Sequence, residues 1–276
     1  MGREKVRRTI RRIINSANYR VIGPLTRRDA KNWASKTDFV KTHRQLFRTL
    51  HDSHSLDEAA KLSVGGEFDA TGLLLRETVI HHGLRSGDYL IDVGCGAGRL
   101  AKPLSEYLQG KYLGIDVVPQ LIEYARRLVA RPDWRFEIAS GLEIPEEDEK
   151  ADMVCFFSVF THLLHEESFV YLREARRVLK PGGKIVFSFL DFRMDDHWSI
   201  FETNVKDVGI GAQPINAFMS ADMFPVWARR LELELETIKD GNEPYVPLSE
   251  PIKYENGKIL TDKGAFGQSV CVMRKR

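Results

Sequence analysis

Three glycines at alternating positions are the residues best suited to binding chemistry. Gly94, Gly96 and Gly98 fall within residues 89–100, where an apolar stretch of strand length runs into a stretch with helical spacing. Glycine lets the backbone turn sharply and approach a ligand, because no Cβ stands in the way. A dinucleotide fingerprint would need a glycine at position 99, which Arg99 occupies. The spacing therefore predicts a ligand-binding loop, but not one for a dinucleotide.

Two acidic residues accompany this loop. Asp92 ends the apolar stretch before the glycines, and Asp116 ends the next such stretch, in Gly114-Ile115-Asp116-Val117. A carboxylate can accept two hydrogen bonds from neighbouring hydroxyls, and charge-assisted bonds are the stronger kind. Asp116 is therefore suited to holding a diol.

Over about residues 65–190, the order of these motifs resembles the class I S-adenosylmethionine-dependent methyltransferases. The resemblance implies S-adenosylmethionine as the cofactor, with Asp92, Gly94 and Gly96 at its methionine moiety. Asp116 would grip both ribose hydroxyls. The same resemblance places Cys95, Gly98 and Val117 among the cofactor-binding residues.

Three further segments resemble parts of the same family. Residues 136–145 match the adenine segment, although Ser140 stands where an aspartate commonly binds the adenine amino group. Gly141 and Leu142 would still meet the ring edge through backbone and apolar surface. Residues 152–163 resemble the fourth strand and the loop that faces the sulfonium and the acceptor, which places Phe156 among the cofactor-binding residues as well. Residues 179–184 match the turn before the fifth strand.

His162 is the candidate catalytic residue. Methyl transfer from a sulfonium is an in-line displacement, so the protein mainly aligns donor and acceptor, and a base is needed only if the acceptor loses a proton. His162 lies in the loop after the fourth strand, where the family's pocket opens. The alternative is a histidine that bonds backbone groups at a helix start. His165 and Glu166 begin the next helix and read as surface groups favoured by its dipole.

The segment after the fifth strand offers weaker candidates. Asp191 and the cluster Asp195-Asp196-His197 lie where an acceptor lid forms in the family, but this combination is too generic to predict a metal. Aromatic residues in this segment could line an acceptor cavity or belong to the core. They are Trp198, Phe201, Phe218 and Phe224.

Short apolar runs alternate with helical patterns from residue 70, which predicts an α/β fold. We expect a doubly wound, seven-stranded, mostly parallel sheet with helices on both faces. The expected helices are 70–84, 98–109, 119–130, 166–179 and 222–233, and the expected strands are 88–93, 111–117, 133–139, 151–157, 183–190, 234–239 and 267–274. Asn256-Gly257 predicts a hairpin between two further short strands. The expected domains are a basic helical extension over 1–64, with Gly65-Gly66 as the hinge, and the main domain over 65–276, with a capping insertion over about 191–233.

Composition indicates one principal folded core. The 276 residues are 43% hydrophobic and 29% charged, which is ordinary for a globular protein. Cys95, Cys155 and Cys271 have no framework spacing and read as reduced thiols of a cytoplasmic protein. No apolar run approaches the length that spans a bilayer, and none follows the basic start in the manner of a secretory signal.

The first 50 residues carry a net charge of +11, against −9 for the remainder. Residues 4–18 have the spacing of a basic amphipathic helix. This opening resembles the N-termini of bacterial methyltransferases associated with cell-surface glycans, which implies a lipid-linked glycan acceptor and peripheral contact with the anionic inner membrane face.

Other interpretations of the chain stay open. The basic helix could pack on the protein's own acidic body, or the opening could be a mitochondrial transit peptide. An RNA methyltransferase with a basic arm is disfavoured, because no Asn-Pro-Pro-Tyr type motif or RNA-binding module occurs. A third possibility is a scaffold that binds the cofactor without catalysis. The sequence predicts no oligomeric state.

Overall fold

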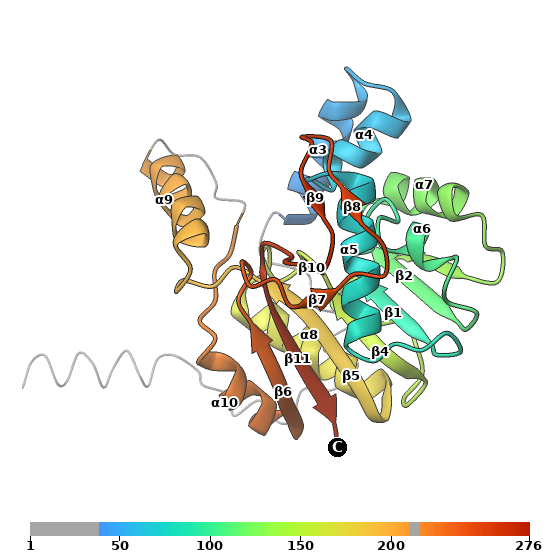
Figure 1. Ribbon diagram of the computed structural model, residues 1–276, viewed down its shortest axis with the longest axis vertical. Helices are drawn as coiled ribbons and strands as arrows, with labels where there is room; N and C mark the ends of the chain where they lie inside the picture. The colour runs from blue at the N-terminus through green and yellow to red at the C-terminus, as the bar shows by residue number, and fades with distance from the viewer. Residues whose placement is uncertain (1–38, 210–215) are drawn as a thin grey trace, which may run out of the picture.

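A computed structural model describes residues 39–209 and 216–276, and its centre is a seven-stranded sheet (Figure 1). The basic helix predicted over 4–18 lies outside the described residues. In spatial order the strands are β3 (Arg135–Ile138), β2 (Tyr112–Asp116), β1 (Leu90–Val93), β4 (Ala151–Phe156), β5 (Leu179–Phe189), β11 (Ser269–Lys275) and β6 (Leu233–Lys239). Neighbours from β3 to β5 are parallel, whereas β11 is antiparallel to both β5 and β6.

Helices cover both faces of this sheet. On one face lie α5 (Phe68–His81), α6 (Ala101–Leu104) and α7 (Pro119–Val129); on the other lie α8 (His165–Val178) and α10 (Met223–Arg230). Successive side chains of a strand point to opposite faces of the sheet. Leu90 therefore packs in the core beneath α5, α6 and α7, and Ile91 in the core beneath α8 and α10. All four residues of β1 are buried, as expected of a central parallel strand. The predicted doubly wound, mostly parallel sheet is confirmed.

One predicted helix is much shorter than expected. The helix predicted over 98–109 is reduced to α6, Ala101–Leu104. Pro103 lies in this segment and has no backbone N–H to donate, which interrupts the ladder of helical hydrogen bonds. The predicted turn before the fifth strand is an irregularity within β5, where Gly182 has a φ of 81°.

Three helices were not predicted. They are α3 (Phe39–His51), α4 (Leu56–Ser63) and α9 (Asp195–Gly209), the last of which projects from the body of the molecule in Figure 1. A capping box begins α4, since Ser55 and Glu58 each bond the other's backbone N–H.

A satellite core joins α3 and α4 to the main domain. Phe47 of α3 and Ala59 of α4 are buried in it with Leu121 and Tyr124 of α7. Both glycines of the predicted hinge, Gly65-Gly66, have positive φ, at 67° and 66°. The described part of the predicted extension therefore packs on the main domain.

Two small ribbons complete the fold. The predicted hairpin is confirmed as β8 (Ile252–Lys253) paired with β9 (Ile259–Leu260), and its Gly257 has a φ of 87°. The other ribbon pairs β7 (Val246–Pro247) with β10 (Lys263–Gly264). The three cysteines are buried and form no disulfide, as predicted. Within 39–209 and 216–276, no helix combines the length and apolarity needed to cross a membrane.

Candidate active site

A cavity of about 580 Å³ opens where β1, β2, β3 and β4 end. Its walls are the loops that follow these four strands, together with residues of α3 and the end of α4. Loops after adjacent parallel strands meet at one edge of the sheet, which is where α/β folds bind ligands. The cavity therefore lies where the sequence motifs predict it.

Two of the three predicted glycines line this cavity. Gly94 and Gly96 have φ values of 78° and 52°, in the left-handed region that favours glycine. A Cβ on Gly94 would lie 2.3 Å from Cγ2 of Val159, so no other residue fits without displacement. Gly98 instead faces α7, where a Cβ would lie 3.1 Å from the Cβ of Ala125. Gly98 therefore allows close packing against this helix and does not line the cavity.

Asp116 is a cavity residue with its carboxylate held in place. One oxygen accepts from the Gly96 N–H at 3.0 Å and the other from the Val118 N–H at 2.8 Å. Burial raises the pKa of Asp116, although these backbone bonds oppose the rise. Each oxygen retains acceptor capacity for a hydroxyl of a ligand. Val117 lines the cavity next to it, as predicted.

Asp92 lies behind the glycine loop instead of on the wall of the large cavity. Its side chain is buried and accepts from the Tyr112 hydroxyl at 2.7 Å and from Cys155 Sγ at 3.5 Å. With Cys95 it borders a separate void of about 30 Å³ under Gly94 and Gly96. Burial raises the pKa of Asp92 to about 6, and the bond from Tyr112 only partly opposes this.

The predicted adenine segment also lines the cavity. Ser140, Gly141 and Leu142 all do so, and the Tyr171 hydroxyl of α8 donates to the Gly141 carbonyl at 3.1 Å. Tyr171 is itself a lining residue, so α8 both positions this loop and closes the cavity behind it.

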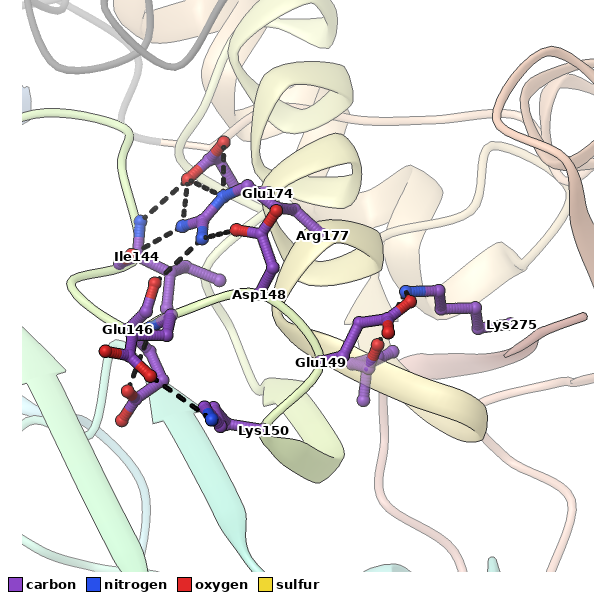
Figure 2. A network of polar contacts seen from close by, with 10 residues as sticks. Ile144, Glu146, Asp148, Glu149, Lys150, Glu174, Arg177 and Lys275 are labelled. Atoms are coloured by element: carbon purple, nitrogen blue, oxygen red, sulfur yellow. Dashed lines mark hydrogen bonds and ion pairs between the residues drawn. The ribbon is translucent and has the colours of Figure 1, made fainter.

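Figure 2 shows how α8 braces the rest of the loop. Arg177 donates to the carbonyls of Ile144 and Glu146 at 2.8 and 2.7 Å and forms a 2.8 Å ion pair with Glu174. Glu174 in turn accepts from the Ile144 N–H at 3.3 Å. The pair is largely buried, with side chains 15% and 3% exposed, so the loop is tied to α8 by charge-assisted bonds.

The loop after β4 brings the predicted base into the cavity. His162 lines it, and the backbone N–H of His162 donates to the Val159 carbonyl at 3.0 Å. Phe156 does not line it, which corrects the prediction made for that residue. Phe156 is fully buried against Phe160 and Tyr171, and Phe157 occupies the cavity wall instead because successive side chains of a strand point to opposite faces.

Sequence reasoning missed the contribution of α3. Val40, Lys41, His43 and Arg44 line the cavity, and Arg44 Nε donates to the Val117 carbonyl at 3.0 Å. The ring of His43 meets that of His162 edge-on, with centroids 4.9 Å apart. No local pattern marks these residues, because tertiary packing alone brings α3 to the site.

Of the candidates after β5, Asp191 and His197 belong to a structural network, whereas Asp195 and Asp196 are exposed in the first turn of α9. Asp191 is fully buried and pairs with Arg193 at 2.7 Å. His197 accepts the Asp191 N–H at Nδ1, and its Nε2 lies 2.8 Å from the Gly267 carbonyl. Among the described residues, no group of three or more histidine, cysteine, aspartate or glutamate side chains is placed to hold a metal.

The aromatic residues of this segment lie away from the 580 Å³ cavity. Phe224 belongs to the core, whereas Trp198 is 45% exposed. Phe201 and Phe218 line a separate pocket of about 230 Å³. Of the two interpretations left open, the structure supports the core for Phe224 and a separate aromatic cluster for the other three.

The residues of the main cavity fit a nucleoside with a charged extension. Asp116 offers acceptors to a diol, and Ser140 to Leu142 offer backbone and apolar surface to a flat ring. The loop at Gly94 and Gly96 leaves room that a Cβ would fill. Beyond these positions the cavity reaches His162, where a second molecule could meet the first.

Comparisons with known proteins agree with this geometry. Residues 91–187 match a family model described as a methyltransferase domain. The chain is 29% identical over 198 residues to 27-O-demethylrifamycin SV methyltransferase of Amycolatopsis mediterranei, covering 70% of each protein. It is 26% identical over 161 residues to a ubiquinone biosynthesis O-methyltransferase of Xanthomonas oryzae, covering 55% of this chain and 65% of that one.

Coverage of other curated relatives is lower, down to 32% of a 37.1 kDa Streptomyces fradiae protein. Among solved structures, magnesium protoporphyrin IX methyltransferase from Synechocystis, with bound SAH, superimposes with a TM-score of 0.55. That match has 13% identity and covers 87% of this chain and 96% of that one. At this identity the likeness concerns the fold.

Proposed function

Because the chain belongs to the class I S-adenosylmethionine-dependent methyltransferases, we propose that it transfers the methyl group of this cofactor to a hydroxyl of a small organic acceptor. One observation carries the proposal: a single cavity joins Asp116 and the glycine loop to His162. A donor and an acceptor can therefore meet inside it.

The cofactor supplies an electrophilic methyl group on a sulfonium. In the proposed arrangement Asp116 accepts from the ribose hydroxyls, and Gly141 and Leu142 meet the adenine. Gly94 and Gly96 bring the main chain against the methionine part. The protein's contribution is then chiefly alignment, which can lower a barrier by about 7–11 kcal/mol in well-oriented reactions.

The hydroxyl acceptor is proposed because of His162. A hydroxyl loses its proton on methylation, and an imidazole is well suited to take it near neutral pH. Two relatives carry names that indicate O-methylation of small molecules, the enzyme for 27-O-demethylrifamycin SV and the ubiquinone biosynthesis O-methyltransferase. The lipid-linked glycan and membrane contact remain predictions, since the basic segment behind them lies outside the described residues.

The direct test measures transfer of label from S-adenosyl[methyl-³H]methionine. The acceptors are catechol, hydroquinone, benzyl alcohol and methyl glucoside, with aniline and thiophenol as the matched amine and thiol. We expect label on at least one hydroxyl compound and less on the amine and thiol. Label only on aniline, thiophenol or added RNA would refute the hydroxyl acceptor, and binding of S-adenosylhomocysteine without any transfer would favour the scaffold.

A further inference from the structure

The acceptor end of the cavity contains two histidines that come from distant parts of the chain. His162 follows β4, and His43 lies on α3, outside the segment that matches the family model. Their ring centroids are 4.9 Å apart at an interplanar angle of 67°. Both residues line the same cavity.

We propose that His43 and His162 form an acceptor-side pair, in which His162 takes the hydroxyl proton and His43 positions His162. This inference rests on the proposed function and deepens it, because it makes α3 part of the acceptor site. His162 receives the proton that the hydroxyl loses as the carbon–oxygen bond forms and the carbon–sulfur bond breaks, with the electron pair of the broken bond remaining on sulfur.

Among the described residues that line the cavity, the other titratable groups are poorly suited to this step. Lys41, Arg44 and Arg99 offer no lone pair when protonated. The Tyr171 hydroxyl already donates to the Gly141 carbonyl, and burial raises its pKa. Asp116 is held at the end of β2 by two backbone N–H groups, on the side proposed for the ribose.

The position of α3 is well determined by packing, which a positioning role requires. Phe47, one turn after His43 on the same helix, is 2% exposed in the satellite core. Arg44, next to His43, bonds the Val117 carbonyl. These two anchors, both C-terminal to His43, fix the helix against the main domain, so the ring of His43 is held beside that of His162.

The test compares His162→Ala, His43→Phe and the double variant, with His51→Phe as the matched control. His51 is on the same helix, but it is exposed and outside the cavity. His43→Phe keeps a ring of similar size and removes the polar nitrogens. Each protein is assayed for kcat with the hydroxyl compound that the native protein methylates fastest, and for S-adenosylhomocysteine affinity by calorimetry.

We expect kcat to fall at least about 100-fold in His162→Ala, the usual range for loss of a general base. Free imidazole should restore part of that loss. We expect a fall of about tenfold in His43→Phe, and no further fall when it is combined with His162→Ala, because residues that act as a unit are not additive. Affinity for S-adenosylhomocysteine should stay within about twofold throughout.

Three results would overturn the pair. They are native kcat in His43→Phe, losses that multiply in the double variant, and a loss of S-adenosylhomocysteine affinity in His43→Phe as large as its loss of kcat. The last would mean that His43 supports the cofactor cavity. If the native protein methylates no hydroxyl compound, the proposed function and the pair both fail. If it does and the variants match it, only the pair fails.

Discussion

Replacing Asp92 with asparagine should make the protein more stable at neutral pH. Asp92 is 3% exposed, and burial raises its pKa from 3.8 to about 6. A carboxyl group whose pKa is higher in the folded state than in the unfolded state opposes folding once it ionises. This rise corresponds to about 3 kcal/mol, at about 1.4 kcal/mol per pKa unit.

The sign of the effect defines the pH window. Below about pH 3 the carboxyl is mostly protonated in both states, and Asp92 contributes almost nothing to the difference. As the pH rises from about 4 to about 6, the unfolded state loses its proton first, and the native protein loses up to about 3 kcal/mol from this group. Asparagine cannot ionise, and its carbonyl can still accept from Tyr112.

The assay is urea unfolding of the native protein and Asp92→Asn at about pH 3 and about pH 8. Asp116, whose pKa burial also raises, affects both proteins alike, so the difference between them isolates Asp92. Asp262→Asn, an exposed site, controls for loss of one negative charge. We expect the variant to gain about 3 kcal/mol relative to native between the two pH values. If the stability of the variant relative to native is the same at both pH values, or falls at the higher one, the fold does not raise the pKa of Asp92.

Three further outcomes follow from the site. Gly94→Ala should abolish S-adenosylhomocysteine binding by calorimetry, because its Cβ would lie 2.3 Å from a valine methyl, whereas Gly182→Ala, with a similar φ of 81° and nothing within 4 Å, should bind normally. Arg177→Ala should lower the free energy of unfolding in urea by about 3 kcal/mol, since it leaves a buried glutamate without its ion pair, and Arg176→Ala, at a partly exposed site, should cost under about 1 kcal/mol in the same measurement. Asp116→Ala should weaken S-adenosylhomocysteine binding at least tenfold, about 1.4 kcal/mol, with an unchanged far-ultraviolet spectrum; equal affinity would remove Asp116 from the ribose site.

The parts of the site that follow local rules could be predicted from sequence. Gly94, Gly96 and Asp116 belong to a strand-to-loop transition, where residue type and spacing decide the backbone path. Strand ends, and hence the shared sheet edge, follow from the apolar runs. Phe156 was wrongly placed because the side-chain period of a strand is two, and an error of one residue moves a side chain to the opposite face.

The parts set by tertiary packing could not be predicted in this way. His43 reaches the cavity only because Phe47 and its neighbours bury against α7. The sequence of α9 is polar and aromatic without a clear period, so no local pattern predicts the helix that carries Asp195 and His197. The motif predicts Asp92 at the ligand, whereas in the structure it lies behind the glycine loop. Its position there depends on the hydrogen bonds from Tyr112 and Cys155, which come from other strands and follow no local pattern.

The insertion of β11 between β5 and β6 has a consequence for synthesis on the ribosome. The ribosome synthesises β6 about thirty residues before β11, the strand that separates β6 from β5 in the folded sheet. Phe224 of α10 can already pack on Phe187 and Phe189 of β5, but until β11 appears β6 has no strand to pair with and is open to misplaced pairing. The nascent protein therefore passes through an interval in which the unpaired edges of β5 and β6 are open to binding by a chaperone.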